Sequence, residues 1–165
     1  MKSLYLVGFM GSGKTSVAAE LHHKLGWLVE DMDALIEQAY QTTIPEVFKE
    51  KGEETFRQYE TEILKQTTKE NTIVSTGGGV IQKEYNRNWL KTHGKVIYLS
   101  TSWEEIKRRL VDDENRPIWN NQDRDKESLL VSRLPYYIEV ADIIVETDGK
   151  TTEQIATEII SHLHE

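Results

Sequence analysis

Residues 8–15 read GFMGSGKT and directly follow a short apolar run. This order fits the pattern G-x-x-x-x-G-K-[ST], in which a backbone loop surrounds the phosphates of a nucleotide. Glycines let such a loop curl and let its N–H groups approach an anion closely. Lys14 would place a positive charge near the β- and γ-phosphates, and the Thr15 hydroxyl is the expected Mg²⁺ ligand. The sequence thus predicts a phosphate-binding loop followed by a helix over Lys14–Leu25, rather than a glycine-rich turn without a ligand.

Two carboxylates close the second apolar run of the chain. Asp31 and Asp33 are two residues apart, so in an extended chain both side chains point to the same side. Beside a nucleotide, one carboxylate can hold the water shell of Mg²⁺ while the other orients a substrate hydroxyl and accepts its proton. The alternative is that one of them only caps a helix beginning at Ala34. We favour the chemical role because of the loop that precedes this pair.

Three consecutive glycines follow the third apolar run, in VSTGGGV at residues 74–80. Such a backbone can lie flush against a ligand, although a flexible connection is the alternative. Arg57 lies in a charged helical segment, where Glu60 is three residues further on and can form an ion pair with it. Arg133 lies in SRLPYY. Taken alone, both arginines look like ordinary surface residues.

The segment from Asp112 to Ser128 is polar and loop-like. A loop of this length in a compact domain is usually functional or disordered. Its Arg116 precedes a proline, and it suggests a mobile lid that brings an arginine onto phosphates while water is excluded. A solvated surface loop is the alternative.

Short apolar runs alternate with helical patterns along the whole chain. This alternation predicts an α/β domain with a central parallel sheet. Several of the apolar runs are nearly continuous, as expected for strands covered on both faces. The expected strands are Ser3–Val7, Trp27–Glu30, Thr72–Ser75, Lys95–Leu99 and Ile143–Glu146. The expected helices after the first are Ala34–Gln41, Ile44–Lys51, Gly52–Thr68, Lys83–Thr92, Ser102–Leu110, Lys126–Ala141 and Thr152–His164. Ligands collect beyond the carboxyl ends of the strands in such sheets, and the candidate residues follow the strands.

Composition narrows the classes of function. The 165 residues suit one domain, and the net charge of −8 is a poor match for nucleic acid or an anionic membrane. The absence of cysteine excludes disulfides and thiol chemistry, and the histidines show no metal-binding spacing. The short N-terminal apolar run is neither a signal peptide nor a membrane span, so we expect a cytoplasmic protein, and we expect a monomer.

The chain resembles the shikimate kinase family over nearly its whole length. The matching segments are GFMGSGKTS at 8–16, DMD at 31–33, IPEVFKEKGEETFR at 44–57, STGGG at 75–79, NRP at 115–117 and RLPYY at 133–137. Their order and spacing are more specific than any one of them. The resemblance implies a three-layer α/β/α P-loop kinase fold with a five-stranded parallel sheet, a substrate-binding region at about 33–61 and a lid at about 112–125. It also implies transfer of the γ-phosphate of ATP to the 3-hydroxyl of shikimate, with Mg²⁺, in aromatic amino-acid biosynthesis.

The resemblance implies a role for each site residue. Lys14, Asp33 and Arg116 would be catalytic, and Asp33 would contact the shikimate hydroxyls. Thr15 and Asp31 would serve Mg²⁺. The nucleotide would be bound by Gly11, Ser12, Gly13, Lys14, Thr15, Ser16, Arg109 beside the adenine, and Arg116 from the lid. The shikimate would be bound by Asp33, Arg57, Gly77, Gly78, Gly79 and Arg133, with the two arginines on its carboxylate.

Three other functions can be weighed on the residues alone. Arg57 and Arg133 indicate an anionic acceptor but not which one, so another small-metabolite kinase such as a gluconate kinase is possible. A GTP-dependent switch would need an Asn-Lys-x-Asp guanine motif and an Asp-x-x-Gly switch motif, and the chain lacks both. A non-catalytic nucleotide-binding module would be favoured by loss of Lys14, Asp31 or Asp33, and all three are present.

Overall fold

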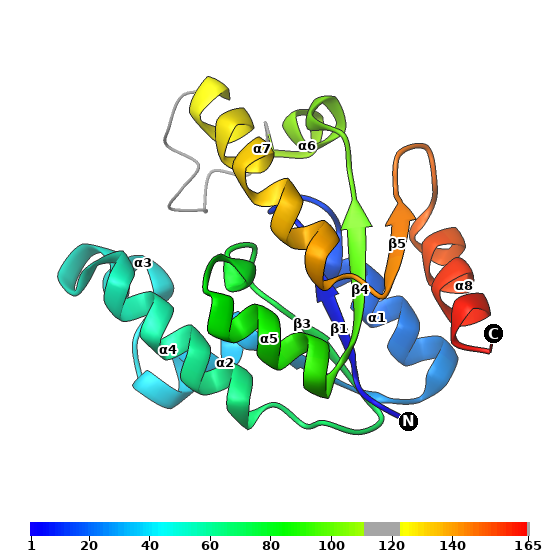
Figure 1. Cartoon of the computed structure of the whole chain (residues 1–165), viewed down its shortest axis with the longest axis horizontal. Coiled ribbons are helices and arrows are strands. Elements are labelled where there is room, and N and C mark those ends of the chain that lie inside the picture. Colours follow the sequence, from blue (N-terminus) through cyan, green and yellow to red (C-terminus); the bar gives the residue numbers. More distant parts are fainter. Residues whose placement is uncertain (111–122, 165) are drawn as a thin grey trace.

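The structure is a computed structural model that describes residues 1–110 and 123–164. Its centre is a five-stranded sheet in the order β2-β3-β1-β4-β5 (Figure 1). The strands are β1 (Leu4–Val7), β2 (Leu28–Asp31), β3 (Thr72–Ser75), β4 (Lys95–Ser100) and β5 (Ile143–Glu146). Every neighbouring pair is parallel, so all five carboxyl ends lie along the same edge.

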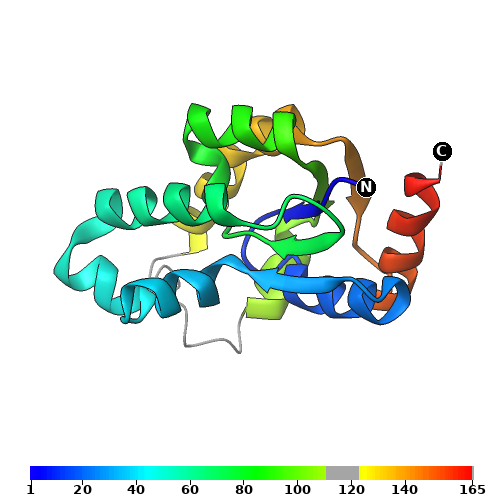
Figure 2. The ribbon, with the colours of Figure 1, turned by 90° about the horizontal axis from the view of Figure 1, so that it is seen from below.

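Helices connect the strands and cover both faces of the sheet (Figures 1 and 2). They are α1 (Lys14–Leu25), α2 (Met32–Tyr40), α3 (Ile44–Glu50), α4 (Gly52–Gln66), α5 (Glu84–His93), α6 (Trp103–Leu110), α7 (Asp123–Val140) and α8 (Thr152–Leu163), with a short 3₁₀ helix, η1 (Val80–Gln82). No helix among the described residues is both long and apolar enough to cross a membrane.

Alternate residues of β1 pack into two separate apolar layers, as the period-two geometry of a strand requires. Tyr5 and Val7 face a layer formed with α2, α3, α4, α5 and α7. Leu4 and Leu6 face a smaller layer formed with α1 and α8. The central strand is fully buried, and Figure 2 shows α5 and α7 on one side of the sheet and α1 on the other. The sheet therefore holds the loops after its strands on a rigid base.

The predicted fold is confirmed, and each predicted strand and helix has a counterpart with ends shifted by a few residues. The two edge strands are covered less than the central ones, since Leu28 of β2 is 73% exposed and Ile144 of β5 is 48% exposed. The segment predicted as a loop up to Ser128 is already helical from Asp123. The rest of the predicted lid, with Arg116, lies outside the described residues.

Candidate functional site

A cavity of about 270 Å³ opens at the carboxyl ends of β1, β2 and β3. It is lined by Met10, Gly11, Gly13, Lys14, Thr15, Ser16, Asp31, Asp33, Ser75, Thr76, Gly77, Gly78, Arg109 and Leu110. Three segments that were predicted separately thus meet here: the glycine-lysine loop, the aspartate pair and the glycine run. Their meeting follows from the strand order, because β3 lies between β1 and β2.

The loop after β1 has the geometry of a phosphate-binding loop. Gly11 and Gly13 have φ values of 82° and 95°, which residues with a Cβ rarely adopt. Gly13 is the N-cap of α1, so the positive end of the helix dipole points into the cavity. The Lys14 ammonium donates to the carbonyl oxygens of Gly8 at 2.6 Å and Phe9 at 3.2 Å. The loop therefore suits the phosphates of a nucleotide.

Ser12 differs from the other residues predicted to bind the nucleotide. It is buried, it does not line the cavity, and its backbone N–H donates to the Phe9 carbonyl at 3.0 Å. Thr15 and Ser16, in contrast, are exposed and line the cavity.

The aspartate pair reaches the cavity by a route that the extended-chain argument did not foresee. Asp31 ends β2 and caps α2, where its Oδ1 accepts a hydrogen bond from the Ala34 N–H at 3.2 Å. Asp33 lies in the first turn of α2, so the two carboxylates do not belong to one extended strand, and that geometric prediction is wrong. Both side chains nevertheless line the cavity. Capping and a site role are therefore compatible for Asp31, because a carboxylate accepts several hydrogen bonds.

The chemistry of the donors fits Mg²⁺ bound together with a nucleotide. Thr15 and Asp31 supply hard oxygen atoms to the same cavity. Among the described residues, no group of three or more His, Cys, Asp or Glu side chains could hold a metal ion. Mg²⁺ in proteins keeps several waters and uses one or two carboxylates with substrate phosphates, so a sparse donor set is what such a site needs.

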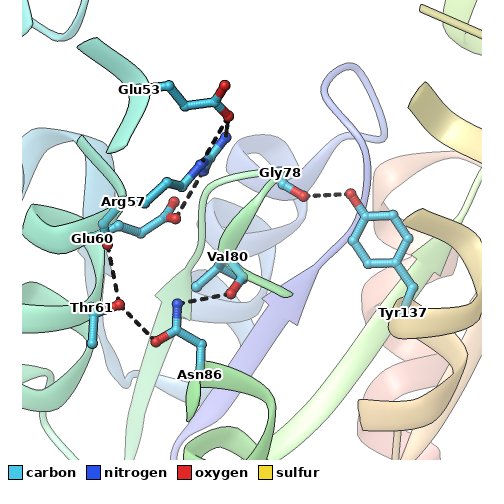
Figure 3. Close-up of polar contacts among 8 residues, drawn as sticks. All are labelled: Glu53, Arg57, Glu60, Thr61, Gly78, Val80, Asn86 and Tyr137. Atoms are coloured by element: carbon cyan, nitrogen blue, oxygen red, sulfur yellow. Dashed lines mark hydrogen bonds and ion pairs between the residues drawn. The ribbon is translucent and has the colours of Figure 1, made fainter. Parts of the chain in front are cut away.

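Arg57 is buried in an ion-pair network on α4 (Figure 3), although its sequence context suggests a surface residue. Its Nη1 donates to Glu60 Oε1 at 2.9 Å, and its Nε and Nη2 lie 3.4 and 3.3 Å from Glu53 Oε2. Glu60 is only 1% exposed. Burial raises the pKa of its carboxyl, and the Arg57 guanidinium opposes that shift. Glu53 and Glu60 hold the Arg57 guanidinium from two sides, so Arg57 has little side-chain entropy left to lose when a ligand binds.

Arg133 of α7 is the second buried guanidinium, at 3% exposed. The Gln82 side chain has one amide orientation that satisfies its neighbours, and in it the oxygen accepts from Arg133 Nε at 3.2 Å and Nη2 at 3.0 Å. No carboxylate forms an ion pair with Arg133 within the part of the chain that the structure describes. Burial lowers the pKa of this guanidinium, and the positive charge of Arg57 adds to the decrease. The charge of Glu60 opposes this decrease without forming an ion pair with Arg133 among the described residues, so an anionic ligand would further relieve the cost of burying the cation.

The glycine run lies next to the charged side chains on one side and reaches the cavity on the other. A Cβ on Gly77 would lie 2.8 Å from Glu60 Oε2 and 3.4 Å from Asp33 Oδ1. A Cβ on Gly78 would lie 3.4 Å from Arg133 Nη1, and one on Gly79 would lie 2.5 Å from both Nη atoms of Arg57. Each glycine therefore contacts a different charged residue. Gly77 and Gly78 line the cavity, whereas Gly79, Arg57 and Arg133 do not, so the two guanidinium groups lie next to the cavity through the glycine run.

Arg109 of α6 lies over the phosphate-binding loop. Its Nη1 donates to the Gly11 carbonyl at 3.0 Å, and its Nε donates to Glu105 at 2.9 Å. It lines the cavity, as a nucleotide-contacting residue must, and its predicted place beside the adenine stays a prediction.

Sequence reasoning missed two residues next to Arg133. Tyr137 is fully buried and donates from its hydroxyl to the Gly78 carbonyl at 2.5 Å (Figure 3). Its position four residues after Arg133 was a readable signal, because that spacing places both on one helix face. Gln82 carried no signal, since the 3₁₀ turn that orients it was not predicted.

Comparison with known proteins agrees with this site. The sequence profile of the family described as shikimate kinase matches residues 10–164. The chain belongs to the shikimate kinase family. A shikimate kinase of Bacillus cereus is 38% identical over 165 residues, covering 100% of both chains.

Solved shikimate kinases have the same fold. The Acinetobacter baumannii enzyme, in complex with shikimate, matches with a TM-score of 0.94 and 36% identity over 99% of this chain and 93% of that one. The Aquifex aeolicus enzyme matches with a TM-score of 0.86 and 33% identity over 98% and 96%. This member of the shikimate kinase family is therefore an enzyme, and the switch and non-catalytic alternatives are set aside.

Proposed function

We propose that this kinase uses the cavity after β1, β2 and β3 to transfer the γ-phosphate of ATP to the 3-hydroxyl of shikimate. ATP-dependent phosphorylation of shikimate is the activity of its family, and it belongs to aromatic amino-acid biosynthesis. One observation supports the residue assignment above all. Two buried guanidinium groups, one of them without an ion pair among the described residues, lie against Gly78 and Gly79, and Gly77 and Gly78 line the same cavity as the phosphate-binding loop.

The two arginines would bind the carboxylate of shikimate. A guanidinium matches a planar carboxylate in bidentate geometry, and two of them fix orientation as well as charge. Gly77, Gly78 and Gly79 would lie along the ring, because their lack of side chains leaves room for it. The acceptor hydroxyl would then point towards the phosphate-binding loop.

The chain's own groups account for most of what this transfer requires. The transition state is loose, so catalysis depends on positioning and on neutralising charge. Lys14 and the loop amides would hold the phosphates, and Asp33 would orient the acceptor hydroxyl and receive its proton as the new P–O bond forms and the bond to ADP breaks. Thr15 and Asp31 would hold Mg²⁺, which neutralises phosphate charge when bound. Arg109 would flank the adenine, and Arg116 would reach the phosphates from the lid.

The remaining assignments concern the cell and the assembly. We infer a cytoplasmic monomer that binds neither nucleic acid nor membrane. The absence of cysteine supports the cytoplasmic location. The net charge of −8 supports the absence of nucleic-acid and anionic-membrane partners.

A coupled assay of ADP release with a panel of hydroxyl acceptors tests the proposal. ADP should form with Mg²⁺, ATP and shikimate, and little should form with gluconate or nucleoside monophosphates. Arg57→Ala or Arg133→Ala should weaken shikimate binding by roughly thirtyfold or more, because truncating one partner of a buried charge pair costs about 2–5 kcal/mol. Arg108→Ala is the matched control, since that side chain is 72% exposed and should leave shikimate binding unchanged. A preference for another acceptor, or unchanged affinity in both buried-arginine variants, would reject the assignment.

A further inference from the structure

Tyr137 has a rigid place between α7 and the glycine run. Its ring stacks on Tyr98 of β4, with centroids 5.0 Å apart and an interplanar angle of 15°. Its hydroxyl donates to the Gly78 carbonyl at 2.5 Å. Both ends of the side chain are thus held, one by the sheet and one by the backbone that lines the cavity. Figure 3 shows the hydrogen bond at the hydroxyl end.

Tyr137 is a hydrogen-bond donor and not a base. Burial raises the pKa of its hydroxyl well above the usual value, so the proton stays on the oxygen throughout the neutral range. A role in removing the proton from a substrate is therefore excluded. What remains is a role in geometry.

Arg133, one helical turn before Tyr137 on α7, also lies next to Gly78. The distance of 3.4 Å between Arg133 Nη1 and a Cβ position on Gly78 means that α7 contacts this residue twice, through Arg133 and through Tyr137. Gln82 occupies the other edge of the guanidinium, at Nε and Nη2, and so directs Nη1 towards the glycine run. The orientation of Arg133 thus depends on two side chains that carry no charge.

We propose that Tyr137 and Gln82 are positioning residues for the substrate carboxylate: Tyr137 fixes Gly78 against α7, and Gln82 fixes the plane of the Arg133 guanidinium. This inference rests on the proposed function, in which Arg133 binds that carboxylate. Neither residue touches the nucleotide side of the cavity, so their effects should be confined to the acceptor.

Tyr137→Phe and Gln82→Leu test the inference, because each removes hydrogen bonds while retaining most of the side-chain volume. Steady-state kinetics should show the KM for shikimate raised about three- to tenfold in each variant, the loss of a hydrogen bond of ordinary strength. The kcat and the KM for ATP should stay near wild-type values. Tyr136→Phe is the matched control, since Tyr136 is 37% exposed and its ring covers Arg87, which a phenylalanine ring also does.

A selective rise in the KM for shikimate supports the inference. An unchanged KM for shikimate, or equal changes for both substrates, overturns it, because a merely structural residue would lower stability without distinguishing the substrates. If Tyr137→Phe does not fold, Gln82→Leu alone decides. A wild-type enzyme that does not phosphorylate shikimate would overturn the proposed function, whereas an active wild type with unaffected variants would overturn only the positioning roles.

Discussion

Substitution of Gly79 by alanine should weaken shikimate binding by moving a single guanidinium group. Gly79 has φ −99° and ψ 10°, which alanine adopts without strain, so the backbone is expected to stay in place. The new methyl group would lie 2.5 Å from Nη1 and Nη2 of Arg57, far inside contact distance. Arg57 must therefore retreat by about 1 Å to reach ordinary van der Waals separation.

That displacement sets the expected size of the effect. Arg57 cannot retreat without disturbing its 2.9 Å hydrogen bond to Glu60 and the orientation that a carboxylate ligand needs. A misplacement of about 1 Å in a positioning group can cost about a hundredfold in rate. We therefore expect kcat/KM for shikimate to fall about a hundredfold, equivalent to about 2.7 kcal/mol, with the KM for ATP nearly unchanged. Shikimate titrations at saturating ATP measure kcat/KM for shikimate, and ATP titrations at saturating shikimate measure the KM for ATP, with ADP release followed in both.

The matched control repeats the substitution in the Arg57→Ala background. The methyl group then has no guanidinium to displace, so Gly79→Ala should add less than about threefold to the loss. The reasoning is refuted if the substitution costs the same in both backgrounds, or if the KM for ATP rises as much as the KM for shikimate. Either result would mean that Gly79 is needed for the backbone conformation and not for the space it leaves to Arg57.

Three further predictions concern the proton, the buried carboxylate and the metal. Asp33→Asn should lower kcat at least about a hundredfold while a fluorescent ATP analogue still binds normally; a near-normal rate would leave Asp33 with no catalytic role. Burial raises the pKa of Glu60 above its ordinary 4.5, so folded protein binds this proton more tightly than unfolded chain, and stability from this group should decline as pH rises through the raised pKa. Urea unfolding from about pH 4.5 to about pH 8 should show a smaller decline in Glu60→Gln than in wild type, and equal slopes would contradict the assignment. Chelation of Mg²⁺ should stop ADP formation and added Mg²⁺ should restore it, with Thr15→Val requiring more metal; activity that survives chelation would remove the metal from the proposal.

The fold and the phosphate-binding loop were the parts most open to prediction from sequence. The loop is contiguous, so its eight residues 8–15 carry their own geometry through glycine φ values and the helix that follows. The strand and helix pattern was equally readable, because burial between two helical layers leaves nearly continuous apolar runs. Predictions weakened where a segment depends on its neighbours, as at the exposed edge strand β2 and at the 3₁₀ turn η1.

The aspartate pair illustrates the limit of local reasoning. Asp31 and Asp33 were expected to share a face because of strand periodicity, yet α2 begins at Met32 and places Asp33 in a helical turn. Both still line the cavity, because fully buried Met32 anchors the start of the helix in the apolar layer next to the site. The two carboxylates were correctly expected near each other, but strand periodicity was the wrong reason.

The sequence by itself determined the class of chemistry, since a phosphate-binding loop, an aspartate pair and an acidic composition are properties of nearby residues or of the whole chain. Only the tertiary structure decided which arginines are buried next to the glycine run. Arg57 and Arg133 look like surface residues in the sequence, and the packing of α4 and α7 over one face of the sheet buries both against Gly79 and Gly78. The physical reason is that covalent spacing governs contacts within a turn or a strand, whereas contacts between distant segments, and the burial that gives a charge its strength, arise only when the layers pack.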